Sequence, residues 1–206
     1  MTPPLGHVAI VEDDAGVREG LEALLESWGY AATLYEDAES LLAEGPPERA
    51  MCLLLDVRLP GMDGLALVSE LRRRGIATPV LMMSAHGDIS TAVEAMRRGA
   101  QDFIEKPFDD EPLIRRIEEL SALALRRPTE DPDARASVDT LTPRETQVMR
   151  EVVAGHANKV IAHRLGISLK TVEMHRSRVM KKTGAKTLAH LVRIALAAGH
   201  RVGDSV

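Results

Sequence analysis

Residues 51–64, MCLLLDVRLPGMDG, are the most diagnostic part of this sequence for its architecture. An unbroken apolar run ends at Asp56 and is followed by a loop that contains proline and glycine. Such a run is typical of a strand that is buried on both faces of a parallel sheet. We therefore expect Asp56 to stand at the carboxyl end of a central strand, where open α/β sheets bind their ligands.

Four more apolar runs occur on either side of this strand, at residues 7–11, 31–35, 79–83 and 101–105. The stretches between them have apolar residues at helical spacing, as in 15–28, 64–74 and 110–126. Strands that alternate with helices in this way predict a doubly wound (βα)5 sandwich. We expect this α/β domain to cover residues 1–126.

Groups suited to phosphoryl chemistry follow four of these runs. Glu12, Asp13 and Asp14 come after the first, Asp56 ends the third, Ser84 follows the fourth and Lys106 follows the fifth. Carboxylates at one edge repel each other unless a cation lies among them, and Mg²⁺ prefers oxygen ligands. We expect Asp56 to be the nucleophile, Glu12 and Asp13 to hold Mg²⁺, and Lys106 and Ser84 to contact a phosphoryl group.

Composition and charge divide the 206-residue chain into two parts. Residues 1–126 have 12 Lys+Arg and 23 Asp+Glu, a net charge of 12 − 23 = −11, whereas residues 138–206 have 12 − 5 = +7. A basic half indicates a polyanionic partner such as DNA. One cysteine, Cys52, no long apolar run and no secretory signal predict a cytoplasmic protein that has no disulfide and does not enter a membrane.

The two parts are joined by a segment rich in charge and proline. We expect residues 127–138 to be a linker, because two prolines and five charges lie between Arg126 and Ala134. Residues 139–206 then have a purely helical period. A capping box begins the first helix at Thr142, and the next two helices, 158–165 and 168–182, are separated by a tight turn at Gly166. A fourth helix runs from Thr187 to about Ala198, so this domain is predicted to be all-α with four helices.

Helix, tight turn and helix is the arrangement that places a second helix in the major groove of DNA. The groups expected to contact phosphates, which position the protein without reading sequence, are Lys159, Lys170, Thr171, Arg176, Arg178 and Lys182. Glu173, Met174 and Ser177 are the candidates for reading base edges. His175 lies on the inward stripe with Val172 and Val179, and we expect it to pack there with one hydrogen bond to a phosphate or to the backbone.

The first half resembles the receiver domain of two-component response regulators. The matching segments are VEDDAGVR, LLLDVRLPGMDG, VLMMSAHGD and GAQDFIEKPF, within residues 7 to about 125. The resemblance implies that a sensor histidine kinase phosphorylates Asp56, and that Mg²⁺ binds Asp13, Asp56 and the backbone carbonyl of Arg58, with Glu12 assisting. It also implies that Ser84 and Lys106 grip the phosphoryl group and that Phe103 is an aromatic switch.

The second half, from LTPRETQVMREVV to LAHLVRIAL, resembles the LuxR-type DNA-binding domain. Together the halves resemble the NarL/FixJ family, with the FixJ branch favoured. This implies a transcription factor, with no enzymatic function of its own, that forms a homodimer on phosphorylation and binds promoter DNA. We expect activation through RNA polymerase, and an effector dimer contact made by Leu188, Leu191 and Val192.

Two other classes share part of this pattern. A ligand-sensing LuxR regulator has the same second half, but it needs an aromatic-lined pocket, and aromatic residues make up only 2% of this chain. A phosphatase of the haloacid dehalogenase type also uses an aspartyl nucleophile with Mg²⁺. It requires a second carboxylate two residues after the nucleophile, where this sequence has Arg58.

Overall fold

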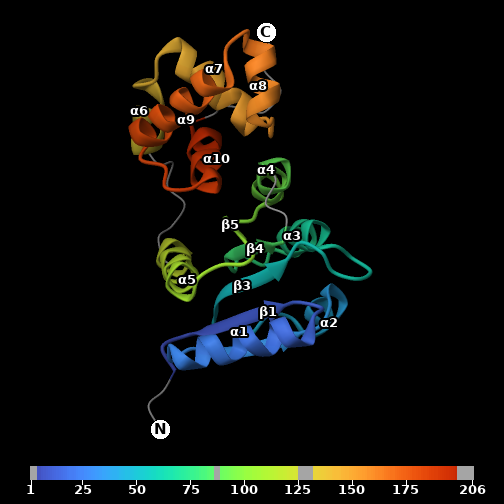
Figure 1. Ribbon diagram of the computed structural model, residues 1–206. Helices are drawn as coiled ribbons and strands as arrows, with labels where there is room; N and C mark the ends of the chain where they lie inside the picture. The colour runs from blue at the N-terminus through green and yellow to red at the C-terminus, as the bar shows by residue number, and fades with distance from the viewer. Residues whose placement is uncertain (1–3, 86–88, 125–131, 199–206) are drawn as a thin grey trace. The chain divides into compact units, whose positions relative to one another are not determined.

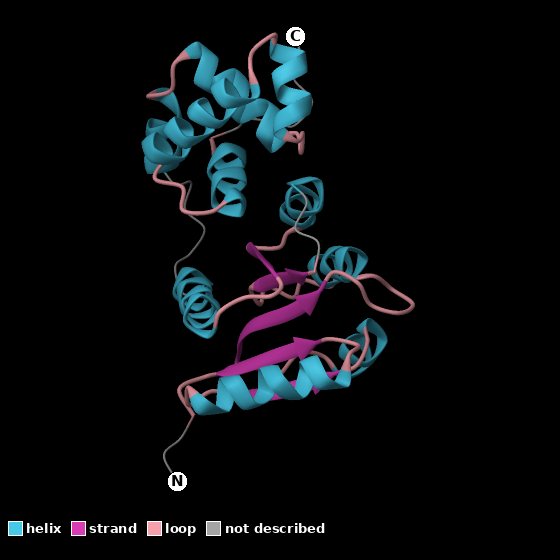
Figure 2. Ribbon diagram, viewed as in Figure 1, coloured by secondary structure: helices cyan, strands magenta, loops and turns pink. Residues whose placement is uncertain are grey.

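The computed structural model describes residues 4–85, 89–124 and 132–198. They form two compact units, one that contains a β-sheet and one that is entirely helical (Figures 1 and 2). We describe each unit by itself. Within the described residues, no helix combines the length and the apolar character needed to cross a membrane.

The α/β unit contains five strands, which are β1 (His7–Val11), β2 (Ala31–Tyr35), β3 (Ala50–Asp56), β4 (Val80–Ser84) and β5 (Asp102–Glu105). The helices that alternate with them are α1 (Ala15–Ser27), α2 (Ala38–Glu44), α3 (Gly64–Arg73), α4 (Ile89–Arg98) and α5 (Asp110–Ala124). Every strand pairing is parallel, and the order across the sheet is β2-β1-β3-β4-β5. The predicted (βα)5 architecture is therefore confirmed.

Both faces of the central strands are buried, which explains why their sequences are apolar throughout. Val8 and Ile10 of β1 and Leu54 of β3 lie in one cluster with apolar residues of α1 and α5. Leu53 and Leu55 alternate with Leu54 and are also fully buried. Figure 2 shows helices on both sides of the sheet. A parallel sheet covered in this way leaves only its edges free for polar groups.

The order of the strands determines where on the sheet a ligand-binding crevice is expected. The chain moves from β1 outward to β2 and then returns to β3 on the other side of β1, so the order reverses between β1 and β3. In open α/β sheets, the crevice outside the carboxyl ends of the strands at such a reversal is where ligands bind. Here it lies between the residues that follow Val11 and the end of β3 at Asp56.

The helical unit differs from the sequence prediction at its start. Its helices are α6 (Pro132–Asp139), α7 (Pro143–Val153), α8 (Asn158–Leu165), α9 (Leu169–Thr183) and α10 (Leu188–Ala197). Helix α6 lies in the segment that we expected to be linker and packs against α9 and α10. Proline can occupy the first turn of a helix, and buried Val138 anchors this one. The expected boundary at residue 126 lies outside the described residues.

Candidate functional site

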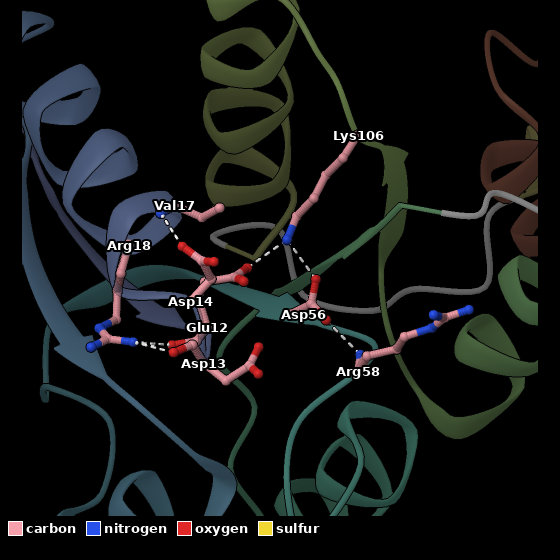
Figure 3. A network of polar contacts seen from close by, with 8 residues as sticks. All are labelled: Glu12, Asp13, Asp14, Val17, Arg18, Asp56, Arg58 and Lys106. Atoms are coloured by element: carbon pink, nitrogen blue, oxygen red, sulfur yellow. Dashed lines mark hydrogen bonds and ion pairs between the residues drawn. The ribbon is translucent and has the colours of Figure 1, made fainter.

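One lysine joins two carboxylates at the carboxyl edge of the sheet. The ammonium group of Lys106, just after β5, donates to Glu12 Oε2 at 2.5 Å and to Asp56 Oδ1 at 2.6 Å (Figure 3). Glu12 and Asp56 are only 3% and 6% exposed. The predicted meeting of the ends of β1, β3 and β5 is therefore present in the structure.

The cluster of Glu12, Asp56 and Lys106 has an excess of negative charge, because one cation serves two buried carboxylates. Burial is the largest influence on Glu12 and raises the pKa of its carboxyl, although Lys106 acts in the opposite direction. Burial alone would lower the pKa of Lys106, but its hydrogen bonds to Asp56 and Glu12 raise it overall. The cluster can therefore accept additional positive charge.

The position of Asp56 is fixed by the loop that follows it. Its second oxygen, Oδ2, accepts the backbone N–H of Arg58 at 2.5 Å. The backbone N–H of Gly64, at the start of α3, donates to the carbonyl of Val57 at 3.0 Å. Glycine is required at residue 64, because any Cβ there would overlap the carbonyl oxygen of Asp56. The sequence analysis did not predict this role of Gly64. The PGMDG motif, which ends at Gly64, was the signal that could have indicated it.

The two acidic residues that follow Glu12 after β1 differ in position and contacts. Asp14 is the N-cap of α1, and its side chain accepts the backbone N–H of Val17 at 2.9 Å. Asp13 is exposed, and Figure 3 shows its carboxylate turned toward Asp56. Arg18, which sequence reasoning also missed, donates to the backbone carbonyls of Glu12 and Asp13.

The remaining receiver residues lie on β4 and β5. Ser84 is 4% exposed at the end of β4, and its carbonyl accepts the backbone N–H of Lys106 at 2.7 Å. Phe103 is half-buried on β5. Arg116 of α5 fixes its backbone by donating to the Phe103 carbonyl at 2.7 Å and to Asp102 at 3.2 Å.

Mg²⁺ was the expected cofactor, and the groups predicted to hold it are all oxygen donors. Within residues 4–85, 89–124 and 132–198, no three His, Cys, Asp or Glu side chains gather closely enough to hold a metal by themselves. The carboxylates of Asp13 and Asp56 would thus need the backbone carbonyl of Arg58 and water to complete a coordination shell. This donor set suits a hard cation that keeps several waters.

In the helical unit, α8 and α9 form the expected helix-turn-helix. Gly166 ends α8 in the left-handed conformation, with φ of 63°, and Ser168 caps α9 by accepting the backbone N–H of Thr171. The exposed members of the predicted DNA-binding set are Lys159, Lys170, Glu173, Met174, Ser177, Arg178 and Lys182. Thr171 is half-buried, and its hydroxyl is hydrogen-bonded to Ser168.

Three residues of the predicted DNA-binding set are engaged or enclosed within the helical unit. The Lys182 ammonium donates to buried Glu145 at 2.7 Å and to the carbonyl of Thr140 at 3.3 Å, so it holds α9 against the start of α7. Arg176 donates to Asn158 of α8 at 2.5 Å. His175 is half-buried, as expected for a residue that packs inward, but its enclosed Nδ1 makes no hydrogen bond to the described residues, so this nitrogen does not make the expected bond to the backbone.

The predicted effector dimer contact is wrong for two of its three residues. Leu191 and Val192 are 1% and 0% exposed, and α10 packs against α6, α7 and α9. They form the core of the helical unit and cannot meet a second copy while it remains folded. Leu188 is half-buried, and the large apolar residue that α10 exposes is Leu196.

Comparison with known proteins assigns both halves of the chain. Residues 8–118 match the family described as "Response regulator receiver domain", and residues 139–195 match "Bacterial regulatory proteins, luxR family". The receiver match decides against the alternative of a ligand-sensing first half.

Relatives of similar length match nearly the whole chain. Transcriptional regulatory protein FixJ of Bradyrhizobium diazoefficiens is 42% identical over 199 residues, which are 94% of this chain and 96% of that protein. FixJ of Rhizobium meliloti is 46% identical, over 93% and 96% of the two chains.

A solved structure extends the likeness to three dimensions. Full-length FixJ from B. japonicum has a TM-score of 0.56 and 40% identity, and the match covers 96% of this chain and 99% of that one. The two FixJ relatives are transcriptional regulatory proteins. This chain is therefore a two-component response regulator of the NarL/FixJ family, a transcriptional regulator in which a receiver domain precedes a LuxR-type DNA-binding domain.

Proposed function

We propose that Asp56 is the residue through which a sensor histidine kinase controls this regulator. The observation that carries the proposal is the placement of the Lys106 ammonium between Asp56 and Glu12. An aspartate at a strand end, beside a fixed cation, is equipped to form an acyl phosphate. A carboxylate oxygen of Asp56 attacks phosphorus, the bond from phosphorus to the kinase histidine breaks, and the histidine nitrogen leaves.

The neighbouring groups then balance the added negative charge. Mg²⁺, when bound by Asp13, Asp56 and the Arg58 carbonyl with assistance from Glu12, would neutralise charge on the phosphoryl oxygens. Lys106 is already within hydrogen-bonding distance of Asp56 and would exchange a carboxylate oxygen for a phosphoryl oxygen. Ser84, at the neighbouring strand end, would donate its hydroxyl to the same group.

Phosphorylation would be transmitted through β4 and β5. The backbone of Ser84 is hydrogen-bonded to that of Lys106, so movement of Ser84 toward the phosphoryl group would affect the strand that holds Phe103. We propose that Phe103 then moves inward and that the surface around α4 and β5 pairs two receivers. Moving from 1% to 99% active needs about 5.5 kcal/mol of differential stabilisation, which phosphoryl contacts and dimer formation would share.

The dimer would bind promoter DNA through α9 and, as we propose, activate transcription with RNA polymerase in the cytoplasm. The exposed residues Glu173, Met174 and Ser177 would face base edges, while Lys159, Lys170 and Arg178 would contact phosphates. A two-fold dimer would cover two half-sites about one helical turn apart. Its affinity would fall steeply as salt rises.

The test of phosphorylation compares two aspartates in the same loop region. Asp63 caps α3 through the backbone N–H of Ala66, and asparagine is an equally good cap, so Asp63→Asn is a matched control for Asp56→Asn. Incubation with acetyl phosphate and Mg²⁺ should add one labile phosphoryl group to the wild type and to Asp63→Asn, detected by intact-mass spectrometry. The same two proteins should dimerise by light scattering. A labile adduct or equal dimerisation in Asp56→Asn would refute the proposal.

A further inference from the structure

We infer that Arg18 is the positioning residue for the acidic loop, and that it sets the affinity of this loop for Mg²⁺. The inference rests on the proposed function. Arg18 Nη1 donates to the backbone carbonyl of Glu12 at 2.6 Å and to that of Asp13 at 3.1 Å (Figure 3). These two residues are the ones expected to bring carboxylates from β1 to the cation.

The location of Arg18 argues against a role in stabilising its own helix. It lies in the N-terminal part of α1, which spans Ala15–Ser27. The helix dipole is positive at this end, so a cation is disfavoured there and an acidic residue would be preferred. Its side chain instead turns back across the N-cap and meets carbonyls that precede the helix. Hydrogen bonds from a guanidinium are charge-assisted and directional, which makes them suitable for holding backbone.

Arg18 completes a set of contacts that fixes the loop from both sides. The backbone N–H of Glu12 donates to the carbonyl of Tyr35 at 3.2 Å and so continues the pairing with β2. Asp14 is held by its capping bond to Val17. Between these points, Arg18 binds two successive carbonyls with one nitrogen and thereby fixes the turn of the backbone. This turn sends the Glu12 side chain to Lys106 and leaves Asp13 exposed.

Two physical effects of Arg18 on Mg²⁺ binding have opposite signs, so they can be separated. Its charge repels a cation, and its removal on this ground alone would tighten binding up to a few-fold. Its hydrogen bonds orient the groups that hold the cation, and loss of such an outer contact commonly weakens binding by about 10- to 100-fold. We expect orientation to dominate, because both bonds are made to the backbone of the ligand residues themselves.

The experiment titrates Mg²⁺ into the full-length protein by isothermal calorimetry at fixed ionic strength. Arg18→Gln should weaken binding about tenfold. Arg18→Lys keeps the charge but has a single ammonium with different geometry, and it should fall between Arg18→Gln and the wild type. Arg115→Gln is the control, since Arg115 is an exposed residue of α5 paired with Glu111. It removes the same charge from the protein and should leave Mg²⁺ affinity unchanged.

A second measurement separates positioning from a general loss of structure. The initial rate of Asp56 phosphorylation by acetyl phosphate should need about tenfold more Mg²⁺ in Arg18→Gln, yet reach the wild-type rate at saturation. Tighter Mg²⁺ binding by Arg18→Gln, or wild-type affinity in both variants, would overturn the inference. A lower saturating rate with no shift in the Mg²⁺ requirement would overturn it too. If the wild type itself neither bound Mg²⁺ nor acquired a phosphoryl group, the proposed function would fail as well.

Discussion

The two units of this protein each contain a nearly inaccessible glutamate paired with a lysine, and the two pairs behave in opposite ways. In the receiver domain, Glu12 meets Lys106, and in the DNA-binding domain, Glu145 meets Lys182. Both glutamates are 3% exposed. The pKa of Glu12 is nevertheless raised by its burial, whereas hydrogen bonding to Lys182 lowers the pKa of Glu145 to about 2.

The first difference is that burial is the largest influence on the pKa of Glu12, whereas the hydrogen bond from Lys182 is the largest influence on that of Glu145. The second is the number of carboxylates that share each cation. Lys106 is divided between Glu12 and Asp56, so neither carboxylate is fully compensated. Lys182 serves Glu145 alone among carboxylates in the described residues, and the same oxygen of Glu145 also accepts the backbone N–H of Thr142 at 2.8 Å. A carboxylate with every partner present stabilises a fold, while a cluster short of positive charge is ready to bind a cation or to undergo chemistry.

The first way to break the comparison is to remove Lys106, and it should have the largest effect. Lys106→Met leaves Glu12 and Asp56 buried together without a counter-charge. Without Mg²⁺ at neutral pH, we expect the free energy of unfolding of the receiver domain to fall by about 3 kcal/mol. Millimolar Mg²⁺ should recover part of that loss, because it supplies the missing positive charge. Urea unfolding followed by the fluorescence of Trp28, the only tryptophan, measures this domain.

Equal stability of Lys106→Met and wild type, or no response of the variant to Mg²⁺, would show that the shared cation is not what balances the site. Arg115→Met, which removes an exposed charge on α5, is the appropriate control and should change little.

Removing the second lysine should have a smaller effect, and Mg²⁺ should not reverse it. Lys182→Met leaves Glu145 without its charged donor, which we expect to lower the stability of the helical unit by about 2 kcal/mol. Far-UV circular dichroism detects this loss, and Trp28 fluorescence should not, because all tryptophan and tyrosine residues lie in the first half. Recovery of stability with Mg²⁺ would contradict the distinction drawn between the two pairs.

The same variant tests whether Lys182, which is bonded to Glu145, also contacts DNA phosphates. Since the Lys182 ammonium is directed at Glu145, the salt dependence of DNA binding should keep its slope in Lys182→Met. Lys170→Met removes an exposed lysine of α9 and should reduce that slope by about one. A reduced slope for Lys182→Met, measured in mobility shifts at several salt concentrations, would show that Lys182 contacts phosphates as well as Glu145.

The residues of the receiver site could be predicted from the sequence because a parallel sheet brings all carboxyl strand ends to one edge. Locating Asp56 and Lys106 after apolar runs was therefore enough to bring them together. Arg18 and Gly64 could not be found in this way. Arg18 acts on backbone carbonyls across a helix N-terminus, and Gly64 is needed because α3 approaches the backbone of Asp56. Neither relation leaves a periodic signal.

In the helical unit, the sequence predicted the helices better than their contacts. The periodicity of α10 identifies an apolar face, but the same face would suit a core or a dimer interface, and burial assigns Leu191 and Val192 to the core. The sequence indicates only that Lys182 is a lysine of a DNA-binding helix. Its bond to Glu145 could not be predicted, because the two residues are 37 positions apart. Helix α6 was missed because charges and prolines conceal the buried Val138.

The two glutamates should also differ in acid, because they change the free energy of unfolding with pH in opposite directions. The pKa of Glu145 is lowered, so its stabilisation is present above the ordinary value of 4.5 and is lost as pH falls toward about 2. This loss should be on the order of 1 kcal/mol between about pH 5 and pH 4. The pKa of Glu12 is raised from 4.5, so the native state takes up its proton first and stability falls as pH rises through that window.

The pH dependence of each domain's stability can be tested by replacing its glutamate with the uncharged glutamine. Glu145→Gln should flatten the pH dependence of the helical unit monitored by circular dichroism, and Glu12→Gln should flatten that of the receiver domain monitored by Trp28. If both variants changed their domains in the same direction with pH, the opposed environments of the two glutamates would be disproved.

The smallest expected effect comes from removing the uncharged partner of Glu145, the side chain of Thr142. Thr142 caps α7 by accepting the backbone N–H of Glu145 at 3.3 Å, while Glu145 returns a bond to the backbone of Thr142, so the two form a capping box. Thr142→Ala should cost about 1 kcal/mol, and Thr142→Ser, which keeps the hydroxyl, should cost almost nothing. Because Lys182 would still hold Glu145, the loss should stay below that of Lys182→Met. Thermal unfolding of the double variant Thr142→Ala, Lys182→Met then decides whether cap and ion pair act as one unit. A summed loss would mean independent contacts, and a smaller one would mean that both secure the same carboxylate.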